Sequence, residues 1–129
     1  MNDKNVIVLG GGLVGSLLSI ILAKRGYDVT VYERRPDMRK EKISAGRSIN
    51  LALSDRGWRG LRIAGIEEAI RKVAIPMPGR MVHSSKGELT FQPYAKEGQF
   101  INSVSRGGLN AELLTLAENH GVKIIFNQR

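Results

Sequence analysis

Val6-Ile-Val-Leu-Gly-Gly-Gly-Leu-Val-Gly15 begins this chain's first regular structure, an apolar run continues to Ala23, and Asp28-Val-Thr-Val-Tyr-Glu33 follows. The pattern predicts a buried strand, a glycine turn, a helix and a second strand that ends in a carboxylate. That order is typical of a dinucleotide-binding βαβ unit. The sequence therefore predicts an α/β fold built on a Rossmann-like unit.

Each glycine of the turn has a separate expected task. Gly10 lets the strand turn sharply, Gly12 lets backbone N–H groups approach a pyrophosphate, and Gly15 lets the helix lie close to the sheet. The N-terminus of the helix carries partial positive charge, which favours an anion. Glu33, 18 residues after Gly15, is expected to accept a hydrogen bond from an adenosine ribose hydroxyl. The glycine pattern is informative because the strand, the helix and the acid surround it.

The length of the chain points to part of a larger enzyme. A chain of 129 residues suffices for one domain with a core, but it is short for a flavin or nicotinamide enzyme with a separate substrate region. Gly121-Val-Lys-Ile-Ile-Phe126 reads as a buried strand that ends three residues before the last residue. We therefore expect residues 1–129 to be a fragment of a longer protein, with the remainder missing.

Composition excludes several classes of site. There is no cysteine and there are only two histidines, so we expect no disulfide, no thiol nucleophile and no metal site. The longest apolar run is far shorter than a membrane span, and the N-terminus leaves no room for a signal peptide. A cytoplasmic location is the expectation.

The net charge of +8 raises the question of nucleic acid. Much of the excess lies between Arg34 and Arg47, a segment that contains no aromatic residue for base stacking. A solvated loop accounts for this segment equally well. Small anionic ligands explain the charge more economically, so we expect no nucleic-acid partner, although a basic nucleic-acid-binding module stays an alternative.

Beyond Glu33, the pattern changes. We expect an extended segment over 48–54, a helix containing Trp58 and Leu61 that ends near Gly65, and a short helix from Ile66 to about Val73. Two strands around a turn at residues 85–87 form a predicted hairpin, a further extended piece spans 101–104, and a helix runs over 106–119. The hairpin argues for part of a substrate region at about residues 75–100.

Three segments resemble the kynurenine 3-monooxygenase family, which belongs to the flavin aromatic hydroxylases related to p-hydroxybenzoate hydroxylase. They are Gly46-Arg-Ser-Ile-Asn-Leu-Ala-Leu-Ser54, Phe91-Gln-Pro-Tyr94 with Arg80 fourteen residues before Tyr94, and Ser103-Val-Ser-Arg106 followed by Leu109-Asn110. The likeness runs from Val6 to at least Leu113, within the N-terminal part of the family's longer enzymes. The resemblance implies a FAD-binding Rossmann-like domain of the glutathione-reductase type, with part of an antiparallel substrate-region hairpin.

The resemblance also implies cofactors and site residues. FAD would be the tightly held cofactor, and NADPH a transient reductant without a nucleotide-binding domain of its own. The cofactor-binding residues implied are Gly10, Gly12, Val14, Gly15, Glu33, Arg34, Arg35, Ala52 and Arg106. For Arg106, a salt bridge with Glu112 or simple solvent exposure is the structural alternative.

Arg80 and Tyr94 look like the family's anchors for the carboxylate of L-kynurenine. A guanidinium forms a two-pronged, charge-assisted pair with a carboxylate, and a phenol adds a donor without charge. The implied reaction is ortho-hydroxylation of L-kynurenine to 3-hydroxykynurenine with NADPH and O₂, and the cofactor supplies its hard chemistry. We identify no side chain as a catalytic acid or base.

Two matters stay open in the sequence. An ordinary NAD(P)-dependent Rossmann oxidoreductase is an alternative, and it predicts continued alternation of strands and helices after Glu33, which the hairpin opposes. The oligomeric state is not indicated, and membrane association through a missing C-terminal region is conceivable because eukaryotic relatives associate in that way.

Overall fold

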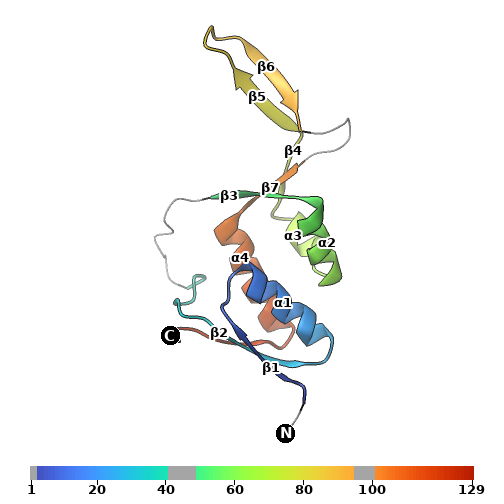
Figure 1. Ribbon diagram of the computed structural model, residues 1–129, viewed down its shortest axis with the longest axis vertical. Coiled ribbons are helices and arrows are strands. Elements are labelled where there is room, and N and C mark those ends of the chain that lie inside the picture. The colour runs from blue at the N-terminus through green and yellow to red at the C-terminus, as the bar shows by residue number, and fades with distance from the viewer. Residues whose placement is uncertain (1–2, 41–48, 95–100) are drawn as a thin grey trace.

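The computed structural model describes residues 3–40, 49–94 and 101–129 (Figure 1). Its helices are α1 (Leu13–Lys24), α2 (Asp55–Ile63), α3 (Glu67–Arg71) and α4 (Arg106–Asn119). Its strands are β1 (Asn5–Leu9), β2 (Asp28–Tyr32), β3 (Asn50–Leu53), β4 (Ile75–Met77), β5 (Gly79–His83), β6 (Leu89–Pro93), β7 (Ile101–Ser105) and β8 (Lys123–Ile125). The predicted α/β class is confirmed. Residues 46–48 of the first resemblance segment lie outside the described residues.

A parallel sheet in the order β1-β2-β8 carries the predicted βαβ unit. Alternation along the strands turns Val8, Val29 and Val31 toward the helices, where each is buried. Helices α1 and α4 lie side by side on that face of the sheet (Figure 1). Ile7 and Leu9 point to the other face and are exposed.

Local signals fix the ends of α4. Ser105 precedes its first turn, and the Ser105 hydroxyl accepts a hydrogen bond from the Gly108 N–H at 3.2 Å. Gly121 has φ +86°, a left-handed conformation that ends the helix and turns the chain into β8. Leu109, Leu113 and Ala117 are buried and give α4 an apolar face. Helix α4 therefore lies where the sequence predicts it and packs against α1.

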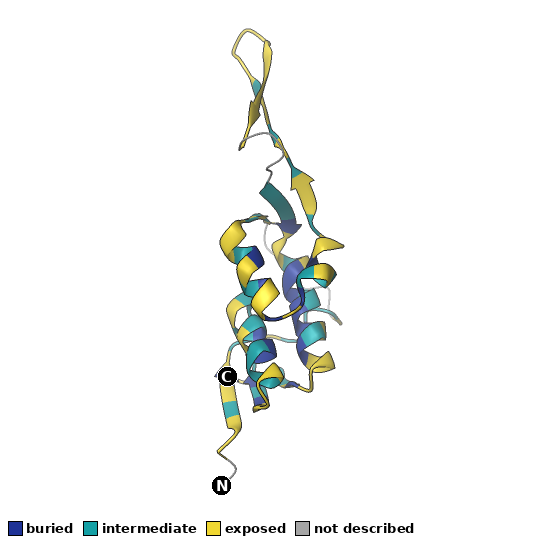
Figure 2. Cartoon of the chain, turned by 90° about the vertical axis from the view of Figure 1, so that its right-hand side faces the viewer, coloured by how far each residue is buried: buried dark blue, intermediate teal, exposed yellow. Residues whose placement is uncertain are grey.

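The middle of the chain forms two further sheets. Strands β3, β7 and β4 pair antiparallel in the order β3-β7-β4, while β5 and β6 form the predicted hairpin. The hairpin projects from the body of the molecule (Figure 1), and Figure 2 shows that its residues are mostly exposed. Ser54 precedes α2 and makes no side-chain cap. Glu67 of α3 is half-buried and pairs with Arg62 and Arg71.

Candidate functional site

The glycine turn connects the carboxyl end of β1 to α1 and lies beside the carboxyl end of β2. Gly10 has φ +102°, and its N–H donates to the carbonyl oxygen of Tyr32 at 2.8 Å. A Cβ at Gly15 would overlap the carbonyl oxygen of Gly10, so only glycine lets the first turn of α1 lie against this loop. A Cβ at Gly12, by contrast, would meet nothing within 4 Å. The turn is therefore closed on the helix side and open at Gly12.

The N-terminus of α1 is left without protein partners. Gly12 is the N-cap residue, no side chain caps the helix, and the first turn holds no acidic residue. Among the described residues, the N–H groups of Leu13, Val14 and Gly15 have no acceptor. Val14 is 81% exposed. These free donors and the positive end of the helix dipole suit an anion.

Glu33 follows β2 and turns its carboxylate back toward the turn. Its Oε2 accepts from the Gly11 N–H at 2.6 Å, and its Oε1 accepts from the backbone N–H and the Nε of Arg35 at 2.9 and 3.1 Å. Burial raises the pKa of Glu33, but the hydrogen bonds from Arg35 and Gly11 together outweigh burial and hold the pKa below its ordinary value. The carboxylate is therefore charged at neutral pH and ties the loop after β2 to the turn.

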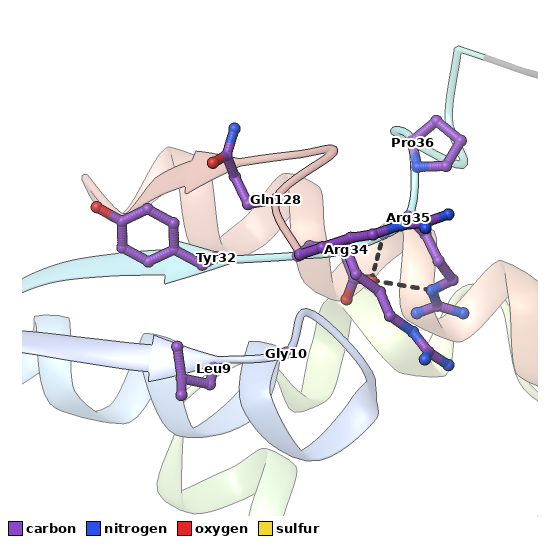
Figure 3. Close-up of a pocket in the computed structure, with 9 residues that line it drawn as sticks. Leu9, Gly10, Tyr32, Arg34, Arg35, Pro36 and Gln128 are labelled. Carbon is purple, nitrogen blue, oxygen red and sulfur yellow. Dashed lines mark hydrogen bonds and ion pairs between the residues drawn. The ribbon is translucent and has the colours of Figure 1, made fainter.

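An open pocket lies beside this carboxylate, at the carboxyl ends of β1 and β2 (Figure 3). It is lined by Leu9, Gly10, Tyr32, Glu33, Arg34, Arg35, Pro36, Gln128 and Arg129. Ligands of open parallel sheets bind outside the carboxyl ends of the strands. Arg34 has no carboxylate partner among the described residues, whereas Arg35 is paired with Glu33. The pocket therefore offers a charged acceptor and a free guanidinium.

Three residues that the sequence reasoning did not assign complete the turn. The carbonyl oxygen of Gly11 accepts from the Ser16 hydroxyl at 3.1 Å and from the Asn110 side-chain amide at 2.9 Å. Asn110 lies on α4 and is buried. Asn110 lies among Leu109, Leu113 and Ala117 on the apolar face of the helix. The sequence could therefore have predicted a buried amide, which requires a hydrogen-bond partner. The identity of that partner was not available from the sequence.

The two residues predicted to lie near the flavin, Ala52 and Arg106, are found where β3, β7 and α4 meet. Ala52 on β3 pairs with Ser103 on β7, and the Arg106 N–H at the start of α4 donates to the carbonyl oxygen of Ile49 at 3.0 Å. Arg106 lies four residues before Asn110, so the two share a face of α4 one turn apart. No ion pair joins Arg106 to Glu112 within the described part of the chain. The exposed Arg106 side chain is therefore on the helix face that reaches the turn.

The predicted substrate residues lie apart from the turn, on the hairpin. Arg80 on β5 is opposite Gln92 on β6, and its Nε and Nη2 donate to the Gln92 side-chain oxygen at 3.1 and 3.0 Å. Tyr94 follows two residues after Gln92, so it belongs to the same face of the hairpin. Both Arg80 and Tyr94 are exposed. The other face carries Met81 opposite Phe91.

A charged cluster outside the predicted site joins the loop after β2 to α4. The Arg39 side chain donates two hydrogen bonds to Asp37, at 2.8 Å each, and also pairs with Glu118. The hydrogen bonds from the Arg39 side chain hold the pKa of Asp37 below its ordinary value. The Arg39 guanidinium lies 5.8 Å from the Phe126 ring centroid. This cluster braces the loop that contains Arg34 and Arg35.

The donor set fits the pyrophosphate and ribose of a dinucleotide. Free amides at a helix N-terminus suit phosphate oxygens, and a charged carboxylate at the end of the second strand suits a ribose hydroxyl. The described residues after Glu33 do not continue as alternating parallel strands and helices, since β3 to β7 pair antiparallel. The nicotinamide-dependent alternative is therefore not favoured. No helix in the described parts of the chain is long and apolar enough to cross a membrane.

Known proteins match both the sequence and the fold. Kynurenine 3-monooxygenase of Myxococcus xanthus is 59% identical over 126 residues, which cover 96% of this chain and 27% of that protein. Kynurenine 3-monooxygenase of Christiangramia forsetii is 50% identical over 127 residues, which cover 98% and 28%. The chain therefore spans about a quarter of the length of these relatives, and the predicted resemblance is confirmed.

Solved structures agree on the fold. The tetrameric form of 2-methyl-3-hydroxypyridine-5-carboxylic acid oxygenase superposes with a TM-score of 0.74 at 23% identity, over 98% of this chain and 32% of that one. p-Nitrophenol 4-monooxygenase from Pseudomonas putida gives 0.72 at 21% identity, over 96% and 32%. A family model described as "FAD binding domain" matches residues 3–129. This match agrees with the unpaired amides at the start of α1 and with the Glu33 carboxylate at the end of β2. The chain belongs to the FAD binding domain family.

Proposed function

We propose that this chain is the N-terminal, FAD-binding portion of a flavin monooxygenase that converts L-kynurenine to 3-hydroxykynurenine with NADPH and O₂. The observation that carries the proposal is the 59% identity to a kynurenine 3-monooxygenase across 126 residues, which include the glycine turn and the hairpin. We use "full-length enzyme" below for the polypeptide in which residues 1–129 are followed by the rest of the relatives' length.

The glycine turn is the proposed site for the adenosine diphosphate half of FAD. The N–H groups of Gly12, Val14 and Gly15 would hold the pyrophosphate, and Gly10 would allow its close approach. Glu33 would accept from the ribose, because a carboxylate offers about four lone-pair positions and the protein uses three of them. Arg34 and Arg35 would lie alongside. This arrangement supports a domain of the glutathione-reductase type.

The flavin half of FAD is assigned to the junction of β3, β7 and α4. Ala52 lies on the exposed side of β3, where a small side chain leaves room for a flat ring. Arg106 would donate to the cofactor from the first turn of α4. When bound, FAD supplies the redox chemistry that transfers one oxygen atom of O₂ to the substrate ring. The residues of this chain bind and orient; none of them is proposed as an acid or base.

Residues 75–100 are proposed to contribute a hairpin to the substrate region. Arg80 would form the two-pronged pair with the carboxylate of L-kynurenine, and Tyr94 would donate a further hydrogen bond from the same hairpin face. Gln92 supports this role, because its side-chain oxygen holds the Arg80 guanidinium without neutralising its charge. Arg80 therefore keeps its full charge for an anionic ligand.

The test is purification of the full-length enzyme followed by two measurements. We expect FAD to be released on denaturation, and NADPH oxidation to accelerate on addition of L-kynurenine with formation of 3-hydroxykynurenine. D-Kynurenine, which presents its carboxylate with the opposite stereochemistry, is the matched control ligand. A protein without flavin, or a flavoprotein that forms no 3-hydroxykynurenine, would overturn the proposal.

A further inference from the structure

The peptide group between Gly11 and Gly12 is held by elements from distant parts of the chain. The Gly11 carbonyl oxygen accepts from Ser16 at 3.1 Å and from Asn110, 99 residues away in sequence, at 2.9 Å. A carbonyl oxygen has two lone pairs, so these two donors saturate it. The Gly11 N–H is also used, by Glu33 at 2.6 Å. Gly11 therefore cannot itself offer a group to a ligand.

This saturation decides where the next amide points. The chain has no cis peptide bond among its described residues, and in a trans peptide the C=O and N–H vectors are antiparallel. Because the Gly11 carbonyl points toward Ser16 and Asn110, the Gly12 N–H points the opposite way. That N–H has no acceptor among the described residues. A Cβ at Gly12 would also meet nothing within 4 Å.

The two donors differ in what they can enforce. Ser16 belongs to α1, the helix that follows the turn, and its hydroxyl rotates freely about the Cβ–Oγ bond. Asn110 is 6% exposed on a helix that packs against α1, so its planar amide has little freedom to move. A carbonyl oxygen only accepts, so the Asn110 amide nitrogen must face Gly11. Asn110 is the donor whose position is fixed independently of the turn.

We propose that Asn110 is a positioning residue for the cofactor: it locks the Gly11–Gly12 peptide so that the Gly12 N–H faces the pyrophosphate. The proposal rests on the proposed function and extends it to a residue that would not touch FAD. Helix α4 would then contribute to binding at both ends of the cofactor, through Arg106 in its first turn and through Asn110 one turn later. Loss of the Asn110 amide would let the peptide rotate and would weaken binding of the pyrophosphate.

The test compares Asn110→Leu with Leu113→Val in the apo form of the full-length enzyme. Leucine has the branched shape and the number of side-chain heavy atoms of asparagine but lacks the polar amide, while Leu113→Val perturbs a buried position of the same helix in the main core cluster. The probes are FAD itself, ADP, which carries the pyrophosphate, and adenosine, which does not. Urea unfolding of each apoprotein reports on stability.

We expect Asn110→Leu to weaken FAD and ADP binding by about tenfold, the loss of roughly one hydrogen bond at 1.4 kcal/mol per tenfold. Adenosine affinity should change less than twofold, and Leu113→Val should leave the ratio of ADP to adenosine affinity at the wild-type value. Equal losses for ADP and adenosine, or unchanged FAD binding in Asn110→Leu, would overturn the proposal. If the wild-type apoprotein binds no FAD, it is the proposed function that fails.

Discussion

Replacing Glu33 with alanine should weaken FAD binding and loosen the glycine turn at the same time. The carboxylate is 5% exposed and accepts from the Gly11 N–H at 2.6 Å and from Arg35 at 2.9 and 3.1 Å. Loss of one charge-assisted hydrogen bond to the ribose corresponds to about 1.5–3 kcal/mol, or roughly 10- to 150-fold in Kd. Within the described parts of the chain, Glu33 is the only acceptor for the buried Gly11 N–H, and its loss should separately lower the free energy of unfolding by about 1–3 kcal/mol.

The assay separates these two effects. FAD titration of the apo form of the full-length enzyme, followed by flavin fluorescence, gives Kd, and urea unfolding of the same apoprotein gives stability. Glu33→Gln is the matched variant, because its amide oxygen still accepts from the Gly11 N–H and so restores part of the stability without restoring the charge. Asp28→Ala, an exposed carboxylate at the opposite end of β2, is the control for charge alone. An unchanged FAD Kd in Glu33→Ala, or an equal loss in Asp28→Ala, would refute the reasoning.

Three further predictions concern the glycine turn, the Glu33 carboxylate and the hairpin. Gly12→Ala should abolish tight FAD binding with little change in apoprotein stability, because the added Cβ meets no protein atom. Gly15→Ala should also lower the free energy of unfolding by about 1–3 kcal/mol, because its Cβ overlaps a backbone oxygen. Equal stability losses for the two variants in a urea titration would contradict this prediction. The pKa of Glu33 lies below its ordinary value of 4.5, so its stabilisation is fully present above about pH 4.5 and is lost as pH falls through the folded pKa. The free energy of unfolding of Glu33→Gln should therefore depend less steeply on pH as the solution is acidified below about pH 4.5. A pH profile identical to that of wild type would exclude this contribution of Glu33. Arg80→Lys should weaken L-kynurenine binding by about 1–3 kcal/mol and Tyr94→Phe by about 0.5–1.5 kcal/mol with FAD content unchanged, measured by flavin absorbance, and unchanged dissociation constants would remove both residues from the site.

The parts of the fold that the sequence predicts are those with a short-range pattern. Strand β1, the glycine turn, α1 and β2 follow from apolar strand residues, glycines and an apolar helix within about 30 residues. Helix α4 follows from its apolar spacing and from Ser105, and the β5–β6 hairpin from the turn around Gly87. Each of these signals is local, so no knowledge of the remaining chain is needed to read it.

The contacts that complete the site join segments far apart in the sequence. The place of β8 beside β2, the Asn110 bond to Gly11 and the pairing of Arg39 with Glu118 leave no periodic signal. The sequence predicts Glu33 as a ribose acceptor alone, and its three hydrogen bonds within the protein emerge only when β2 and the turn are placed together. Local patterns therefore predict the candidate site, and tertiary packing determines how its groups are held.

Turnover of L-kynurenine by the full-length enzyme under ¹⁸O₂, with NADPH and FAD present, tests the central claim most directly. The account predicts 3-hydroxykynurenine that carries one ¹⁸O atom in its new hydroxyl group, detected by mass spectrometry, in wild type and at a reduced rate in Arg80→Lys. Label-free product, or oxidation of NADPH without any L-kynurenine-dependent hydroxylated product, would contradict it.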